Sequence, residues 1–333
     1  MNLVFIDGKS VLQIGTRSFV VEDAIEYITL ADSFVKNKIG TGHGEGKLYV
    51  GQQGKPESFF GDFDSAKCFV LKKDFLSFLG DAKTEYEAPK QDYQKRNKMP
   101  QIYLQNLLKV NGLRKEVNYF QIYRVQVAPP RVYINSNSEF YEMIRTLGLP
   151  NISYLSILKL KDVLDNSIFF YFRIFIDYKN DIVPYKSSEE EKQIDEINKS
   201  LIPAREKQVL TNARIGQGEY RKKLLDKCPF CPFTLVNDER MLIASHIKPW
   251  AESDDDEKID PKNGFMLTPT YDRLFDRGFI SFEDDKTLLV SPWLSPMNQK
   301  RLDIYSGKKI DKLPLDAKRI AYLKYHREHI FKS

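Results

Sequence analysis

The segment spanning residues 241–278 constrains the fold most, because it carries start and stop signals for four consecutive elements. Met241–Ser245 is short and apolar, which suits a strand, and an Asn-Gly turn precedes a second short strand at Phe265–Leu267. Thr268-Pro269-Thr270 is typical of a helix start, and Gly278 is typical of a helix end. The residues between them form about two helical turns. The segment therefore predicts the order strand, loop, strand, helix, with an acidic loop at Glu252–Asp260.

The chain before residue 187 shows alternating signals for strands and helices. Ser138–Leu147 has the apolar spacing of a helix, with Ser138 as its start and Gly148 as its stop. Pro129-Pro130 should end or turn the strand that precedes it. These patterns predict a mixed α+β fold. The runs that predict strands are Leu3–Ile6, Lys47–Val50, Cys68–Leu71, Tyr119–Val127, Val132–Ile134 and Ile168–Ile176.

The composition changes after Tyr185, which indicates a domain boundary near residue 187. Lys186–Glu191 is charged and polar and is interpreted as a linker, followed by one or two exposed helices within Glu191–Leu210. Thr211–Leu225 is predicted to be a helical lead-in to the segment described above. The expected organisation is an α+β domain at residues 1–186 and a second domain at residues 187–333.

Charge and composition exclude some classes of protein. The 333 residues contain no apolar run of about 18, so no membrane span is expected, and the N-terminus lacks the pattern of a signal peptide. Three cysteines argue against a disulfide scaffold, and a reducing cytoplasm is the consistent compartment. The net charge of +5 permits a polyanionic partner without requiring one. The basic stretch Lys90–Arg114 suits phosphate contacts, or is simply a solvated surface with a basic loop.

Two groups of residues in the segment can carry chemistry. His246 follows the first predicted strand, and a histidine is the natural general base near neutral pH. Asp272 and Asp276 are four residues apart on the predicted helix, so their carboxylates share a face and could bind Mg²⁺ or Mn²⁺. The alternative for Asp276 is an ion pair with Arg273 or Arg277, and the alternative for His246 is a satisfied structural histidine.

Two central motifs and two flanking sequences occur together in this part of the chain: SHIKPW at residues 245–250, NGFMLTPTYDRLFDRGFISF at residues 263–282, and the flanking RIGQGEYR and AYLKYHREHIF. In this order and spacing they resemble the HNH nuclease family, and the resemblance covers about residues 211–332. It implies a C-terminal ββα-metal nuclease domain that hydrolyses phosphodiester bonds in double-stranded DNA with a divalent metal ion. The resemblance does not extend to residues 1–186, which are interpreted as a target-recognition domain.

The resemblance also implies roles for individual residues. His246 corresponds to the general base, and Asn263 braces the loop and orients that histidine. Ser245 stands where family members often place an aspartate or histidine metal ligand, and Asp272 stands where the third histidine of the family name is usual. The metal would therefore be held by Asp272 and Asp276, with Ser245 as a weak ligand. The candidate phosphate contacts, each of which could equally be a surface or bracing cation, are Lys248, Arg273, Arg277, Arg214 and Arg221.

Cys228 and Cys231 form a Cys-x-x-Cys knuckle of the kind that binds structural zinc. A zinc site needs four ligands, which His326 and His329 could complete if the C-terminal helix packs back. A knuckle without metal is the favoured interpretation.

Three functions are compatible with these patterns. The first is a restriction-type DNA endonuclease that recognises a defined sequence or a modified base, acting as a homodimer because one module cuts one strand. Gln101, Gln105 and Asn111 are then candidates for base contacts. The second is a non-catalytic DNA-binding protein with a decayed nuclease module, suggested by Ser245 and the missing histidine. The third is a nuclease switched on by a small-molecule signal.

Overall fold

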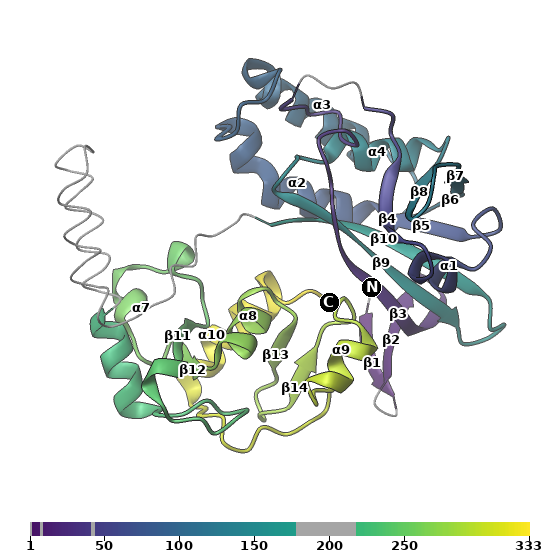
Figure 1. Ribbon diagram of the computed structural model, residues 1–333. Helices are drawn as coiled ribbons and strands as arrows, with labels where there is room; N and C mark the ends of the chain where they lie inside the picture. The colour runs from purple at the N-terminus through teal and green to yellow at the C-terminus, as the bar shows by residue number, and fades with distance from the viewer. Residues whose placement is uncertain (1, 7–8, 41–43, 178–217) are drawn as a thin grey trace. The chain divides into compact units, whose positions relative to one another are not determined.

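The computed structural model describes residues 2–6, 9–40, 44–177 and 218–333 (Figure 1). Their contacts divide them into two compact units. The first unit contains the residues up to Asp177 together with Pro292–Leu302, and the second contains the rest. The predicted boundary near residue 187, the linker, the helices at Glu191–Leu210 and the first part of the lead-in lie outside the described residues.

The first unit is built on a seven-stranded sheet with the order β1-β2-β3-β9-β10-β5-β6. Neighbouring strands pair antiparallel except β10 and β5, which are parallel. The predicted strand Ile168–Ile176 is confirmed as β10, a central strand rich in aromatic and β-branched residues that suit a buried sheet. The strands are β1 (Asn2–Ile6), β2 (Lys9–Ile14), β3 (Arg17–Thr29), β5 (Lys67–Leu71), β6 (Val117–Phe120), β9 (Ser153–Asp162) and β10 (Ile168–Ile176).

Helices gather on one face of this sheet and enclose the main core (Figure 1). Even-numbered residues of β10, such as Phe170 and Phe172, belong to this core because successive side chains of a strand point to opposite faces. The predicted helix at Ser138–Leu147 is confirmed: the Ser138 side chain accepts a hydrogen bond from the Phe140 amide and caps it. The helices are α1 (Lys55–Phe60), α2 (Lys72–Glu87), α3 (Met99–Asn111) and α4 (Glu139–Leu147), with a 3₁₀ turn at Arg96–Lys98.

The strand predicted at Tyr119–Val127 is not continuous, and this prediction is wrong. The chain pairs with β5 as β6 up to Phe120, and then joins a separate three-stranded sheet as β7 (Tyr123–Val125). That sheet has the order β4-β8-β7, with β4 at Leu48–Gln52 and β8 at Arg131–Asn135. An aromatic and β-branched run predicts extended backbone but does not reveal a change of pairing partner.

The first unit also contains a segment from late in the chain, Pro292–Leu302, which includes α9 (Pro296–Arg301). Trp293 is fully buried and packs edge-on against Tyr171 and Phe175, with ring centroids 4.9 and 5.2 Å apart. The Glu26 carboxylate accepts hydrogen bonds from the Ser295 amide at 2.6 Å and from the Asn298 side chain at 2.7 Å. This segment therefore covers the odd-numbered side chains of β10, on the face opposite the main core.

The second unit contains the predicted order of strand, loop, strand and helix. The first strand is β11 (Ile243–His246), which pairs antiparallel with β12 (Gly264–Leu267) and is followed by α8 (Pro269–Asp276). The loop between the strands is not entirely irregular, because Asp254 and Glu257 form a reciprocal capping box that starts a short helix, α7 (Asp255–Ile259). The remaining elements are residues 218–227, which are helical, 3₁₀ turns at Glu239–Met241 and Trp250–Glu252, β13 (Ile280–Phe282), β14 (Leu288–Val290) and α10 (Ala317–His329).

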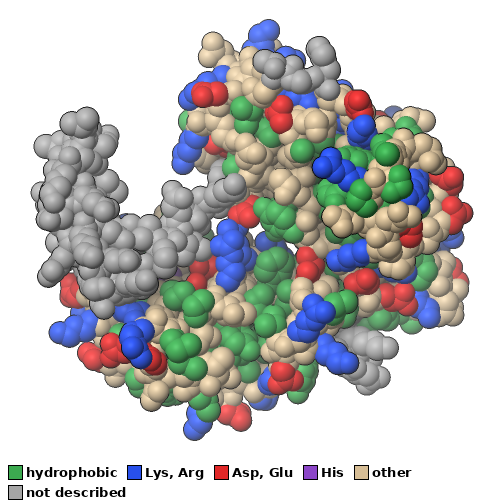
Figure 2. All heavy atoms as spheres, in the orientation of Figure 1, with side chains coloured by type: hydrophobic (Ala, Val, Ile, Leu, Met, Phe, Trp, Pro, Cys, Tyr) green, Lys and Arg blue, Asp and Glu red, His purple; other side chains and the backbone are tan. Residues whose placement is uncertain are grey.

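The model thus confirms an α+β protein with helices and sheets in both units. On the face shown in Figure 2, Lys and Arg side chains are scattered among acidic ones and do not form one large patch. The basic stretch at Lys90–Arg114 consists of a loop, the 3₁₀ turn at Arg96–Lys98, the helix α3 and the residues after it, and most of its cations lie before α3. Every helix in the described parts of the chain is too short or too polar to cross a membrane.

Candidate active site

His246 is the last residue of β11 and is held by contacts on several sides. Its ring stacks on Tyr220, with centroids 3.9 Å apart and planes 17° apart, and meets Trp250 edge-on at 5.6 Å. The ring nitrogen Nε2 lies 3.0 Å from the carbonyl oxygen of Lys258. The imidazole is therefore fixed in one orientation by packing and by one directional hydrogen bond.

That hydrogen bond also determines which nitrogen of His246 can act as a base. A carbonyl oxygen only accepts, so Nε2 must carry a hydrogen and donate it to Lys258. In the neutral ring Nδ1 is then unprotonated and has a lone pair available. Burial lowers the pKa of His246, although the Lys258 carbonyl opposes that shift, so the neutral form predominates at physiological pH.

Asn263 is fully buried and holds the loop that carries Lys258. Its Oδ1 accepts from the Lys248 amide at 2.8 Å, and its Nδ2 donates to the carbonyl oxygens of Lys248 at 3.2 Å and Glu257 at 3.1 Å. Because Glu257 directly precedes Lys258, these bonds fix the peptide that orients His246. These hydrogen bonds join Asn263 to both sides of the loop between β11 and β12, and the bracing role of its side chain stays a prediction.

Tyr220 contributes to the site although the sequence suggested no role for it. It is fully buried in the helical residues 218–227, and its hydroxyl donates to the Asn263 carbonyl at 3.0 Å. Gly264 is required beside it, because a Cβ there would lie 1.8 Å from the Tyr220 hydroxyl. The pKa of Tyr220 is raised mainly by burial, and the Asp276 charge adds to the shift. Tyr220 thus touches His246 and lies within electrostatic range of Asp276.

Ser245, Asp272 and Asp276 lie together where α8 packs on β11. The Ser245 hydroxyl donates to Asp276 Oδ1 at 3.4 Å, and it also hydrogen-bonds Asp272. Ser245 and Asp272 are buried, whereas Asp276 keeps access to solvent. Loss of hydration raises the pKa of both carboxyl groups, and at Asp276 the Asp272 charge raises it further. The pair therefore carries negative charge in a place where that charge is costly.

This arrangement fits a hard divalent cation. Asp276 forms no salt bridge with Arg273, which was one alternative to metal binding, although the Arg273 charge acts on both carboxyl groups and opposes the rise in their pKa. Among the described residues no three histidine, cysteine or acidic side chains are placed to hold a metal ion together, so the protein would supply two carboxylates and a hydroxyl. Mg²⁺ commonly binds through one or two carboxylates and keeps several waters or substrate phosphate oxygens as its other ligands.

The candidate phosphate contacts differ in how available they are. Arg273 is exposed and Arg277 is half-buried. Lys248 is paired with Glu257, with Nζ 2.5 Å from Oε2. Arg221 is buried and donates to the carbonyl oxygens of Leu242 and Glu239 at 2.9 and 2.6 Å, which is a bracing role and not a position facing a phosphate. Arg214 lies outside the described residues.

Cys228 and Cys231 are both buried, but no third ligand joins them among the described residues. Burial raises the pKa of the Cys228 thiol. At Cys231 burial acts in the same direction, but hydrogen bonds with Thr234 and Thr268 outweigh it and lower the pKa. His329 is exposed, and His326 is engaged elsewhere, as described next. The residues that the structure describes do not make up a four-ligand zinc site.

His326 is a buried structural histidine. Its Nε2 donates to the Phe275 carbonyl at 3.1 Å, its Nδ1 accepts from the Ser281 hydroxyl at 3.0 Å, and its ring stacks on Phe275 at 4.0 Å. Both ring nitrogens of the neutral imidazole thus have hydrogen-bond partners, one in α8 and one in β13. Burial lowers its pKa to about 4.

We expect His326 to make the protein less stable in acid. In the unfolded chain His326 is protonated below about pH 6.5, whereas in the folded protein it stays neutral down to about pH 4. The neutral His326 therefore contributes its full share to the free energy of unfolding above pH 6.5, and this share is lost as the pH falls from 6.5 to 4. The loss reaches about 3 kcal/mol in the free energy of unfolding by pH 4. Urea unfolding of wild type and His326→Gln at several pH values measures it. Identical pH slopes in the two proteins would contradict this prediction.

If the site hydrolyses phosphodiesters, as the resemblance implies, we expect Asn263→Ala to slow cleavage about 10- to 100-fold, mainly through kcat, because the loop that carries Lys258 loses its hydrogen bonds to Asn263. It should also lower the free energy of unfolding by about 3 kcal/mol, since buried backbone groups lose their partners. Asn263→Asp keeps the acceptor for the Lys248 amide and should recover part of the stability. Single-turnover and steady-state kinetics with thermal unfolding measure these effects, and an unchanged kcat in a folded Asn263→Ala protein would exclude the positioning role.

Comparison with protein families decides the class of this site. Residues 228–283 match the family model described as HNH endonuclease, and the match includes β11, β12 and α8. The C-terminal part of the chain carries an HNH endonuclease domain. No curated protein matches the chain. The HNH domain identifies a nuclease, and it contains the histidine, the asparagine and the two carboxylates described above.

Proposed function

We propose that the protein is a metal-dependent DNA endonuclease of the restriction type. The proposal rests on one observation above all: His246 presents an unprotonated Nδ1 in the HNH domain, while Ser245, next to it in the chain, contacts Asp276 of a carboxylate pair whose pKa values burial raises in spite of the nearby Arg273 charge. A base and a cation site on adjacent residues are what hydrolysis of a phosphodiester requires.

In this mechanism Nδ1 of His246 removes a proton from a water molecule, whose oxygen attacks phosphorus as the bond to the 3′ oxygen breaks. The Lys258 carbonyl keeps the ring in place and favours the imidazolium that forms. Arg273 and Arg277 would contact phosphates, and Lys248 would do so by exchanging Glu257 for the DNA backbone. Asp272, Asp276 and Ser245 would hold Mg²⁺ or Mn²⁺, which supplies stabilisation of negative charge on the phosphate and the departing oxygen.

Target recognition would fall to the first unit, which has no part in the HNH match. Gln101, Gln105 and Asn111 are exposed on α3 and suit base contacts. The recognised feature would be a defined sequence or a modified base. Since one HNH site cuts one strand, a homodimer would produce a double-strand break.

The test is incubation of the purified protein with unmodified and modified plasmid DNA, in Mg²⁺ or in EDTA. Discrete fragments that appear only with the metal ion are expected, and the fragment ends give the recognised site. An absence of cleavage of every DNA with every divalent ion would count against the proposal and in favour of a non-catalytic DNA-binding protein.

A further inference from the structure

The three-stranded sheet of the first unit has one face in the core and one face in contact with solvent. Leu48, Val132 and Ile134 point into the core and are buried. The alternate residues Tyr49 and Tyr133 point outward, directly opposite each other in the β4–β8 register. Two aromatic side chains therefore stand side by side on the solvated face of a sheet, where polar residues are usual.

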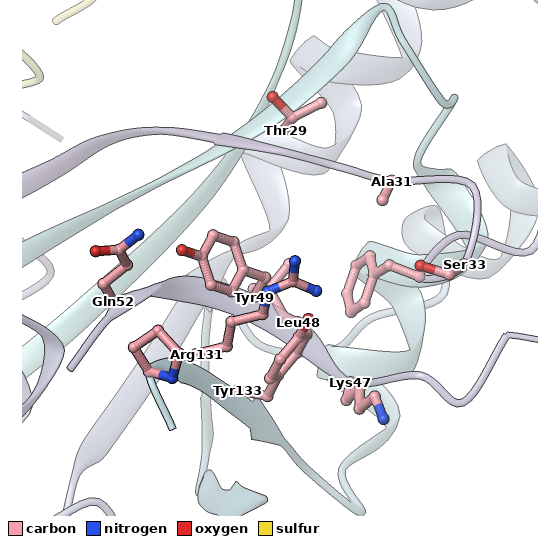
Figure 3. A pocket seen from close by; sticks show the side chains of 11 residues that line it. Thr29, Ala31, Ser33, Lys47, Leu48, Tyr49, Gln52, Arg131 and Tyr133 are labelled. Carbon is pink, nitrogen blue, oxygen red and sulfur yellow. The ribbon is translucent and has the colours of Figure 1, made fainter. Parts of the chain in front are cut away.

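These two tyrosines form part of the wall of a pocket of about 510 Å³ (Figure 3). This volume is within the range of pockets that bind small organic ligands. Figure 3 shows the side chains of Tyr49, Tyr133 and Arg131 gathered in one part of the pocket, with Lys47 at one end and Gln52 at the other. Thr29 and Ser33 add hydroxyl groups from the end of β3 and the turn after it.

The charge of the pocket is one-sided. Its lining contains the cations Lys47 and Arg131 and no acidic residue. Lys47 is paired with Glu45 and lies 5.5 Å above the Tyr133 ring. Arg131 is exposed, and in the described parts of the chain it has no acidic partner. The pocket therefore suits an anion and disfavours a cationic ligand, which would need carboxylates beside the rings.

The Tyr49 ring is exposed, and the Tyr133 ring is partly exposed. Tyr49 is 41% exposed, and its ring centroid is 5.4 Å from that of Tyr133 with the planes 55° apart. A cross-strand aromatic pair stabilises a sheet modestly on its own. Sheet stability does not require an unpaired arginine at the same place, nor hydroxyl and amide groups around the rings. A ligand with a flat aromatic part and an anionic part would use all of them.

We propose that this pocket binds one nucleotide unit, with its base stacked on Tyr49 and Tyr133 and its phosphate on Arg131. Stacking on tyrosine is a common way to hold an unpaired base, and arginine binds phosphate oxygens in pairs. Thr29, Ser33 and Gln52 can hydrogen-bond the edge of the base. The unit would be a base turned out of a DNA strand or a free nucleotide. The first would make the pocket part of target recognition and so rests on the proposed function, whereas the second would make it an effector site.

The experiment measures binding without cleavage, using the full chain with His246→Ala so that nuclease activity plays no part. Fluorescence anisotropy is measured with a labelled single-stranded oligonucleotide and with duplexes that contain or lack one mismatched base pair. Calorimetry is performed with the free nucleoside 5′-monophosphates. Tyr49→Leu, Tyr133→Leu and Arg131→Gln are compared with Tyr119→Leu, which removes a tyrosine that is 53% exposed on β6, outside the pocket.

We expect each pocket variant to weaken binding about 5- to 100-fold, as loss of one stacked base or one phosphate contact does, while Tyr119→Leu leaves it unchanged. Preference for single-stranded or mismatched DNA identifies the flipped base, and tight binding of a monophosphate identifies the free nucleotide. The proposal would be overturned if the pocket variants and the control variant bound both the oligonucleotides and the free nucleotides equally well, provided that circular dichroism shows every variant to be folded. That result would leave the nuclease function intact, because DNA cleavage is assayed separately with the wild-type protein.

Discussion

His246→Ala should abolish DNA cleavage, with a fall in rate of about 10²- to 10⁴-fold, the usual contribution of a general base. The truncated side chain removes Nδ1, and no other described side chain shares its position between Tyr220 and Lys258. The carboxylate pair is left intact. Binding of Mn²⁺, measured by calorimetry, should therefore change little, which separates the loss of a base from the loss of a metal site.

The matched control for this variant is His329→Ala, which removes an exposed histidine of the same unit. It should cleave DNA at the wild-type rate. A folded His246→Ala protein that cleaves at more than about a tenth of the wild-type rate would show that another group accepts the proton.

Asp272→Asn and Asp276→Asn should each reduce cleavage at limiting Mg²⁺ by about 100-fold or more and weaken Mn²⁺ binding in parallel. An amide preserves the shape of each side chain but removes the charge that attracts the ion. Raising the Mg²⁺ concentration should recover part of the activity, as expected for a lost ligand and not for a lost base. Calorimetry with Mn²⁺ and cleavage assays across a Mg²⁺ series measure the two effects.

Asp311→Asn is the control for removing one carboxylate, because Asp311 is exposed and lies outside α8. Without metal, Asp272→Asn should be at least as stable as the wild type, because burial penalises the charged carboxylate in the folded protein. If both α8 variants cut DNA normally at limiting Mg²⁺, the ligands are assigned incorrectly even though the HNH family is correct.

The sequence predicted those parts of the site that depend on local signals. The strand at β11, the turn before β12 and the start and end of α8 follow from short patterns, and they place His246, Asn263 and the aspartates on the right elements. Tyr220 could not be predicted, because its role depends on a helix packing against β11 and β12 from outside the motif. The sequence RIGQGEYR was the only signal for it, and that sequence indicated a family but not a contact.

Long-range pairing limited the prediction of the rest. The run from Tyr119 to Val127 has uniform β propensity, yet β6 and β7 pair in different sheets. Propensity is a property of neighbours along the chain, whereas sheet membership depends on strands far away. The nucleotide pocket was missed for the same reason: Tyr49 and Tyr133 are 84 positions apart in number, and only the β4–β8 register makes them neighbours.

The packing of Pro292–Leu302 on β10 has a practical consequence for the design of truncated forms of this protein. A fragment that stops before the HNH domain would lack Trp293 and α9, and would leave Tyr171 and Phe175 exposed to water. Such a fragment should aggregate unless residues 292–302 are supplied, for example through a linker or as a separate peptide. The same applies to recombination between related genes: a crossover between β10 and the HNH domain exchanges the sheet without the segment that covers it. A replacement for the first unit would have to fit the segment 292–302 of its host, with a carboxylate at the position of Glu26 and aromatic rings around Trp293.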